Sequence, residues 1–159
     1  MLFRSGCFAV IVSRADSPRV NSKSAVTIQA MGTSVGFDGA AQMMWSRTDL
    51  KPKDVKVAEI YDGFSILAVE WMEALKLVPK FEGCRFIEGG KRIARDGELP
   101  LNTSGGQLSA GRMHGYVALH EACVQLRKIG GVRQVTPRPD VAVVCSGAEH
   151  FTSALLLAL

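Results

Sequence analysis

The sequence predicts an α/β fold in which one sheet of five strands packs against helices. The strand-like segments are continuous apolar runs rich in β-branched residues, which is typical of strands that are covered on both faces. These runs alternate with segments of helical periodicity, as layered α/β folds require. The chain has 159 residues, of which 47% are hydrophobic and 21% are charged, so one packed domain is expected rather than a disordered chain.

The first half of the chain is expected to hold three strands and two helices. We expect the second strand to end at Gly32, and Lys51-Pro52 to separate the first helix from the third strand. The second helix is the clearest element, because its apolar residues recur at intervals of three and four. The expected strands are residues 8–13, 25–30 and 55–60, and the expected helices are residues 39–47 and 64–77.

The second half is expected to contain one long helix and two strands. Residues 79–100 are polar and rich in glycine, which favours loops. The long helix is expected to end at the Gly130-Gly131 pair. The expected helix is residues 115–129, and the expected strands are residues 141–145 and 153–159.

Composition excludes several classes of function. The formal charge is +4, but 15 acidic residues are mixed among 19 basic ones, so no basic face for nucleic acid is expected. The longest apolar runs, 7–12 and 154–159, are far shorter than the roughly 20 residues that span a bilayer, and no secretory signal is recognised. We therefore expect a cytoplasmic protein without a membrane span. The four cysteines are Cys7, Cys84, Cys123 and Cys145, and they are too widely spaced for a zinc or redox motif. No metal site or bound cofactor is expected.

The first residues suggest a boundary. Residues 1–5 read Met-Leu-Phe-Arg-Ser, and the last four match what a translated sequencing-adapter end would encode. We expect an assembly scar over 1–5, followed by a single domain over 6–159 from a truncated gene.

Three segments combine loop-forming glycine with reactive side chains. Residues 58–65 lie at a strand-to-helix switch, residues 102–116 form a glycine-rich approach to a helix, and residues 143–148 end a strand. In open α/β sheets, ligands bind at such places. Each of these three segments is therefore a candidate place for a ligand.

The same segments resemble motifs of the carboxy-terminal half of the thiolase superfamily. Tyr61-Asp62-Gly63-Phe64 stands where thiolases carry Asn-Glu-x-Phe or His-Asp-x-Phe, and residues 102–115 match the Asn-x-x-Gly-Gly…Gly-His-Pro-x-Gly block. Cys145-x-Gly147 matches the Cys-x-Gly-Gly-Gly block. The order and spacing are most similar to the thiolase-like proteins of the sterol-carrier or non-specific lipid-transfer type, from about Cys7 onward.

The resemblance implies a five-stranded mixed sheet that pairs with an amino-terminal half of the same fold. That half carries the nucleophilic cysteine of a thiolase, and none of the cysteines here matches its motif. The implied activity is acyl transfer on lipid- or sterol-type 3-ketoacyl-CoA thioesters, with the coenzyme A thioester as substrate and no turnover by the isolated chain. The implied partners are the amino-terminal half, a second copy in a homodimer and a small accessory OB-fold domain.

The sequence also departs from the thiolase pattern. Arg112 and Met113 stand where the family has its catalytic histidine and a proline, and a guanidinium binds anions but does not accept a proton. His114 brings an imidazole two residues later. Tyr61 and Tyr116 supply phenols, which superfamily members recruited as aldolases use in acid-base chemistry. The alternatives are therefore a retro-aldolase acting on β-hydroxyacyl-CoA and a non-catalytic acyl-CoA or lipid carrier.

The resemblance assigns two groups of site residues, each with a structural alternative. Cys145 is otherwise a packing residue, Arg112 a solvated side chain, His114 a helix-capping residue, and the tyrosines half-buried aromatics. The expected catalytic residues are Cys145, Tyr61, His114, Tyr116 and Arg112, and the expected substrate- and coenzyme A-binding residues are Gly105, Gly106, Gly111, Gly147 and Phe64.

Overall fold

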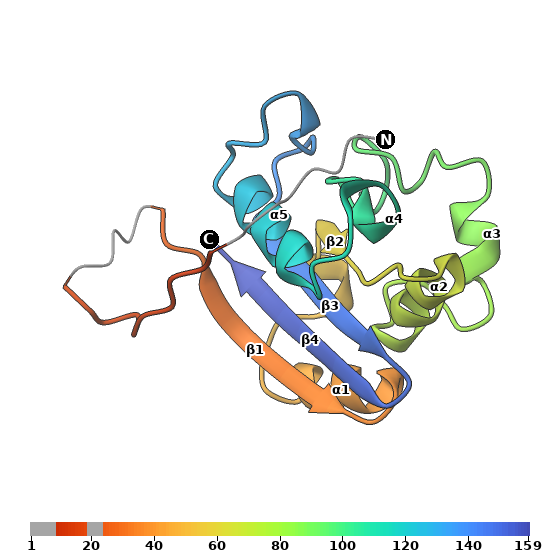
Figure 1. Cartoon of the computed structure of the whole chain (residues 1–159), viewed down its shortest axis with the longest axis horizontal. Helices are drawn as coiled ribbons and strands as arrows, with labels where there is room; N and C mark the ends of the chain where they lie inside the picture. The colour runs from red at the N-terminus through yellow and green to blue at the C-terminus, as the bar shows by residue number, and fades with distance from the viewer. Residues whose placement is uncertain (1–8, 19–23) are drawn as a thin grey trace.

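The computed structural model describes residues 9–18 and 24–159, and within them the chain forms one mixed sheet of four strands in the order β1-β4-β3-β2 (Figure 1). β2 and β3 are parallel, whereas β3 pairs with β4, and β4 with β1, in antiparallel fashion. The mixed α/β architecture that the sequence predicts is confirmed. The strands are β1 (Thr27–Ser34), β2 (Val57–Glu59), β3 (Val141–Ala148) and β4 (Phe151–Ala158).

The expectation of a fifth strand over 8–13 is wrong for its described part. Residues 9–13 form no regular structure, and Ile11 and Val12 are 96% and 73% exposed. The run has the composition of a strand, but strand formation depends on a neighbouring strand and a surface to cover, and the segment packs against neither. Phe8 and the expected scar over 1–5 lie outside the described residues.

A single bridge occupies the place beside β2 where a fifth strand would lie, but no strand continues from it. Leu101 makes an isolated parallel bridge to Ala58, through hydrogen bonds from Ala58 N–H to the Pro100 oxygen and from Asn102 N–H to the Ala58 oxygen, both 2.9 Å. Pro100 has no N–H to continue the ladder. Asn102 has a φ of 48°, which turns the backbone away from the strand conformation. This bridge brings residues 102–107 to the end of β2.

Within residues 9–18 and 24–159 the structure has five α-helices, which include all three that the sequence predicts. The two additional ones have five residues each, and α3 lies within the segment expected to be loops. Gly32 does not end β1, which continues to Ser34. The glycine instead allows the first helix to pack closely against the strand, because a Cβ there would lie 2.0 Å from the Ala40 oxygen. The helices are α1 (Phe37–Trp45), α2 (Ser65–Ala74), α3 (Gly83–Ile87), α4 (Gly106–Ala110) and α5 (Tyr116–Leu126).

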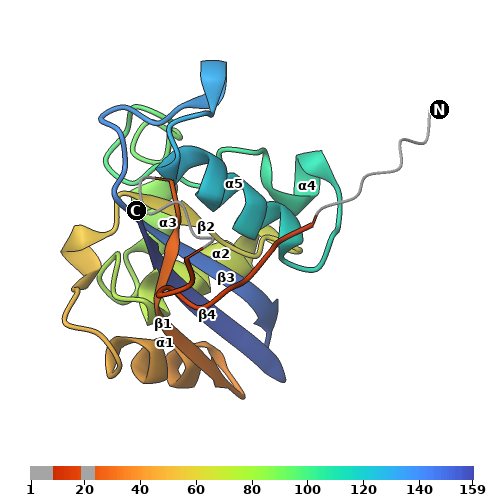
Figure 2. The ribbon, with the colours of Figure 1, turned by 90° about the vertical axis from the view of Figure 1, so that its left-hand side faces the viewer.

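Both faces of the sheet are covered along β3. Val143 and Cys145 belong to the core formed with α1 and α2, whereas Ala142 and Val144 belong to a second core under α5. Figure 2 shows α5 and α1 on opposite sides of the sheet. This double burial explains why β3 reads as a continuous apolar run instead of an alternating one.

Candidate functional site

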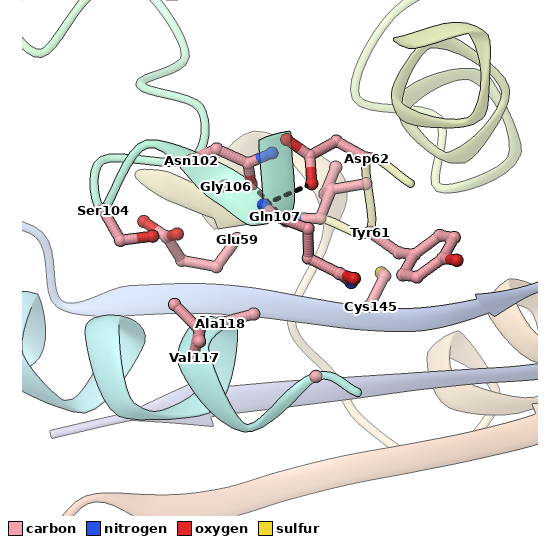
Figure 3. Close-up of a pocket in the computed structure, with 12 residues that line it drawn as sticks. Glu59, Tyr61, Asp62, Asn102, Ser104, Gly106, Gln107, Val117, Ala118 and Cys145 are labelled. Carbon is pink, nitrogen blue, oxygen red and sulfur yellow. Dashed lines mark hydrogen bonds between the residues drawn. The ribbon is translucent and has the colours of Figure 1, made fainter. Parts of the chain in front are cut away.

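The three predicted segments meet at the carboxyl end of β2 and beside the middle of β3, around a small cavity (Figure 3). Tyr61 N–H donates a hydrogen bond of 3.1 Å to the Cys145 carbonyl oxygen, which holds the first and third segments together. Residues within 59–62, 102–107 and 115–118 line the cavity with Cys145. Its volume of about 10 Å³ is roughly the room that one water molecule needs.

Two side chains fix the glycine-rich segment to the residues after β2. The Asn102 Oδ1 atom accepts a 2.7 Å hydrogen bond from Ile60 N–H. The Asp62 Oδ1 atom accepts one of 2.7 Å from Gln107 N–H, which lies in the first turn of α4 and has no acceptor within that helix (Figure 3). The position of α4 therefore depends on the 59–62 segment.

Gly106 is required for this contact, which leads to a prediction. Its φ is +62°, and a Cβ there would lie 2.0 Å from Asp62 Oδ2. We expect Gly106→Ala to displace Asp62, break its bond to Gln107 and lower the free energy of unfolding by about 2–4 kcal/mol in denaturant titrations. Gly90→Ala is the matched control, because Gly90 has a φ of +72° but open space around it. Equal losses in the two variants would contradict the assigned contact.

Cys145 lies at the wall of the cavity and is 1% exposed. Burial raises the pKa of its thiol well above the ordinary value. The thiol is therefore protonated at neutral pH, a state in which it is a weak donor and not a proton acceptor.

Tyr61 is a further residue in the wall of the same cavity. Figure 3 shows its hydroxyl pointing away from Cys145. The hydroxyl lies over Gly63, where a Cβ would come within 2.4 Å of it. Gly63 thus provides the space for the Tyr61 hydroxyl.

A second, more open hollow of about 200 Å³ adjoins the first at Gly115. His114 and Tyr116, at the start of α5, form part of its wall. Much of the remaining lining is apolar and includes Leu119, Val144 and Leu155. The expected catalytic residues are thus divided between two neighbouring hollows. Arg112 is exposed and lines neither hollow.

The expected binding residues are also dispersed. Gly106 lines the first cavity, while Gly105 and Gly111 flank α4 with positive φ. Gly147 belongs to the β3–β4 hairpin, where its carbonyl oxygen accepts a 3.1 Å hydrogen bond from the buried Trp71 indole. Phe64 is 72% exposed and lines neither hollow. The ligand-binding roles of these residues stay predictions.

A buried polar group that the sequence did not single out stands at the cavity wall. Glu59 is 0% exposed, and its Oε2 atom has no hydrogen-bond partner. Burial raises the pKa of Glu59 to about 8, opposed by hydrogen bonds from Thr103 and assisted by the charges of Glu121 and Asp62. At neutral pH the Glu59 carboxyl is therefore mostly neutral.

Glu121 and Gln125 continue this polar group into α5. They follow Val117 at intervals of four and so share its buried face, a sequence signal that predicts buried polar side chains. Burial acts to raise the pKa of Glu121. Hydrogen bonds from Arg133, Gln125 and Thr103, with the Arg133 charge, outweigh this effect and bring the pKa below its ordinary value.

Residues 9–18 and 24–159 contain no group of three or more His, Cys, Asp or Glu side chains that could hold a metal ion. In the same residues, every helix is too short or too polar to cross a membrane.

Comparison with known proteins identifies the family. Residues 19–159 match the family model described as thiolase C-terminal domain-like. The chain is 31% identical, over 89% of its length, to the 17-hydroxy-3-oxo-4-pregnene-20-carboxyl-CoA lyase of Mycobacterium tuberculosis, and 37% identical, over 64%, to the sterol carrier protein 2 of Gallus gallus. It spans 43% and 19% of the lengths of these two relatives.

The fold has a solved counterpart. A structure titled Ltp2-ChsH2(DUF35) aldolase superposes with a TM-score of 0.75 and 26% identity, covering 84% of this chain and 39% of the other. The family model and the sterol carrier relative confirm the resemblance that the three motifs indicate. The chain belongs to the thiolase C-terminal domain-like family.

Proposed function

We propose that this chain is the carboxy-terminal half of a thiolase-like carbon–carbon lyase that cleaves a β-hydroxyacyl-CoA thioester of lipid or sterol type. The observation that carries the proposal is the set of groups around the two hollows. Tyr61 lines the first hollow and Tyr116 the second, so each hollow has one tyrosine in its wall, whereas the thiol of Cys145 is buried and protonated. A guanidinium, Arg112, stands in place of the thiolase histidine.

The proposed reaction suits acid-base groups and needs no nucleophile. A base takes the proton of the β-hydroxyl, and the bond between Cα and Cβ breaks. Cβ becomes a carbonyl carbon, and the enolate left on the shorter acyl-CoA takes a proton at Cα. A phenol donates a hydrogen bond at neutral pH and exchanges a proton when it is suitably placed, so Tyr61 and Tyr116 are the proposed acid-base pair.

The size of the hollows supports a site that is completed by other parts of a longer protein. Their volumes of about 10 and 200 Å³ lie below the range of about 300–1,000 Å³ that is usual for small-molecule sites. We propose that an amino-terminal half supplies the remainder, and that a homodimer and a small OB-fold domain are further partners. The names of the lyase relative and the aldolase structure support the lyase reaction. The isolated chain is expected to show no turnover.

Acyl transfer on 3-ketoacyl-CoA is the second candidate. The observation that favours it is the position of Cys145 at the cavity wall, where the resemblance assigns an acid-base cysteine. In this reaction an upstream nucleophilic cysteine forms the acyl-enzyme, and Cys145 exchanges the proton.

A variant of Cys145 separates the two candidates in the chain joined to its amino-terminal half. In the lyase proposal Cys145 has no acid-base role, so Cys145→Ala should cleave β-hydroxyacyl-CoA within about threefold of the unmodified rate. Loss of a true acid-base group would lower the rate by about a hundredfold or more. The measurement is the rate of carbonyl-product formation, with circular dichroism to verify folding. A hundredfold loss in a folded variant would favour acyl-transfer chemistry, and acyl-CoA binding without any product would favour a carrier.

A further inference from the structure

A chain of buried polar groups leads from the cavity wall to the surface. The Glu59 Oε1 atom lies 3.0 Å from the backbone nitrogen of Thr103 and 2.7 Å from its Oγ1 atom. The same Oγ1 atom lies 2.9 Å from Glu121 Oε1. Arg133, whose side chain is 49% exposed, donates from Nη2 to Glu121 Oε2 at 3.1 Å. The groups come from β2, from the glycine-rich segment, from α5 and from the turn after it.

The position of the Thr103 hydroxyl determines how many acidic protons Glu59 and Glu121 hold between them. A hydroxyl has one hydrogen, yet this one lies within hydrogen-bond distance of a carboxyl oxygen on either side. It donates to one of them, and the other contact is a hydrogen bond only if that carboxyl carries a proton itself. For both contacts to be hydrogen bonds, Glu59 and Glu121 must share one acidic proton.

The surroundings of the two carboxyls place that proton on Glu59. Glu121 accepts hydrogen bonds from the Arg133 guanidinium and from Gln125 Nε2, both of which favour its charged form. Glu59 has no cationic hydrogen-bond partner among the described residues, and the charged groups that act on it most directly are the carboxylates of Glu121 and Asp62, with Arg133 beyond Glu121. Thr103 thus donates to Glu121 and accepts from Glu59.

The other oxygen of Glu59, Oε2, connects this series of polar groups to the cavity. Glu59 Oε2 is buried without a partner, and Ser104 Oγ is a second buried oxygen of this kind. Both residues line the cavity, and Figure 3 shows the Glu59 carboxyl on the side of Ser104. A buried acceptor that lacks a donor is costly, so these oxygens indicate a binding place for a small hydrogen-bond donor such as water.

We propose that Glu59 is a neutral carboxylic acid at the inner end of a proton relay that runs through Thr103 to Glu121 and carries a proton out of the cavity. In one transfer, a cavity water takes the proton that the substrate hydroxyl loses as its Cα–Cβ bond breaks and passes a proton to Glu59 Oε2, the Glu59 Oε1 proton moves to Thr103 Oγ1, and the Thr103 hydrogen moves to Glu121 Oε1. Glu59 and Thr103 end in their starting protonation states, and Glu121 becomes neutral beside Arg133. This inference rests on the proposed lyase reaction for its substrate, but its geometry does not.

The protonation state is tested on the 159-residue chain without any turnover. In a chain labelled with carbon-13 at the glutamate carboxyls, we expect one resonance to titrate near pH 8, and Glu59→Gln to remove it. Thr103→Val should move that midpoint upward, because ionised Glu59 accepts the Thr103 hydrogen and the variant removes this donor, whereas Thr103→Ser should leave the midpoint in place. A Glu59 resonance that titrates in the ordinary glutamate range would overturn the neutral acid and the relay with it.

The role in catalysis is tested in the chain joined to its amino-terminal half. We expect Thr103→Val, which removes the hydroxyl but keeps the shape, to lower kcat by about tenfold to a hundredfold with little change in KM. Thr103→Ser, which keeps the hydroxyl, should restore kcat. Glu98→Gln, an exposed carboxylate paired with Arg92, is the control and should leave kcat unchanged.

The outcomes distinguish the relay from the proposed function. If the unmodified protein cleaves β-hydroxyacyl-CoA and Thr103→Val retains its kcat, the relay is refuted while the lyase proposal stands. If the unmodified protein cleaves no such substrate, the lyase proposal fails, and the titration near pH 8 still decides whether Glu59 is held neutral.

Discussion

Tyr61→Phe, in the chain joined to its amino-terminal half, is expected to lower kcat for carbon–carbon cleavage by about a hundredfold to ten-thousandfold. The change removes only the phenolic oxygen and keeps the ring of this cavity residue, so substrate binding and KM should change little. The measurement is steady-state release of the carbonyl product from β-hydroxyacyl-CoA.

A second variant keeps the Tyr61 hydroxyl but moves it. Gly63→Ala places a methyl group 2.4 Å from the present position of the hydroxyl oxygen, so the ring must shift. We expect an intermediate loss of kcat, because a displaced proton donor is less effective than a positioned one. Full activity of Tyr61→Phe, together with dependence on an upstream cysteine, would contradict the lyase proposal and favour acyl transfer.

Glu59→Gln is expected to change how stability depends on pH. The pKa of Glu59 is about 8 in the folded chain and 4.5 as its ordinary value, so the folded state binds more protons between these values. The free energy of unfolding should therefore fall as pH rises from about 4.5 to 8, by about 1.4 kcal/mol per pH unit and about 5 kcal/mol in all. Because glutamine does not ionise, Glu59→Gln should remove this fall and be the more stable protein at pH 8.

The measurement is denaturant unfolding at a series of pH values. Glu98→Gln serves as the matched control, since its carboxylate is exposed, and it should keep the slope of the unmodified chain. Glu121 affects the pH dependence of stability in the opposite direction. Because its pKa is lowered in the folded chain, its contribution to stability is present at pH values above the ordinary glutamate pKa and is lost as the pH falls through the folded-state pKa. Identical slopes between pH 5 and 8 with and without Glu59 would contradict its burial as a neutral acid.

The sequence predicts the order and type of the long elements but not how the sheet is completed. Alternating apolar runs and helical periods locate β2, β3, α2 and α5 to within a few residues. The run over 9–13 has the same composition as a buried strand, and only the absence of a neighbouring strand distinguishes it. α3 and α4 escape prediction because five residues are too few to show a helical period.

The candidate site, like the fold, is predicted only in part from the sequence. The motifs locate the three segments, which the structure brings together at the carboxyl end of β2 and beside the middle of β3. They do not show that Tyr61 and Tyr116 line different hollows, because this depends on where α5 begins relative to β3. The sequence does not single out Glu59, because a single acidic residue between Ala58 and Ile60 resembles the solvent-facing position of a strand. Here α5 covers that face with further polar side chains.

The most direct test of this account compares two substrates with the chain joined to its amino-terminal half. One reaction contains β-hydroxyacyl-CoA without free coenzyme A, and the other contains 3-ketoacyl-CoA with free coenzyme A. The account predicts a carbonyl compound and a shorter acyl-CoA from the first, in equal amounts, and no thiolysis in the second. Thiolysis in the second reaction, with no product from the first, would contradict the lyase proposal.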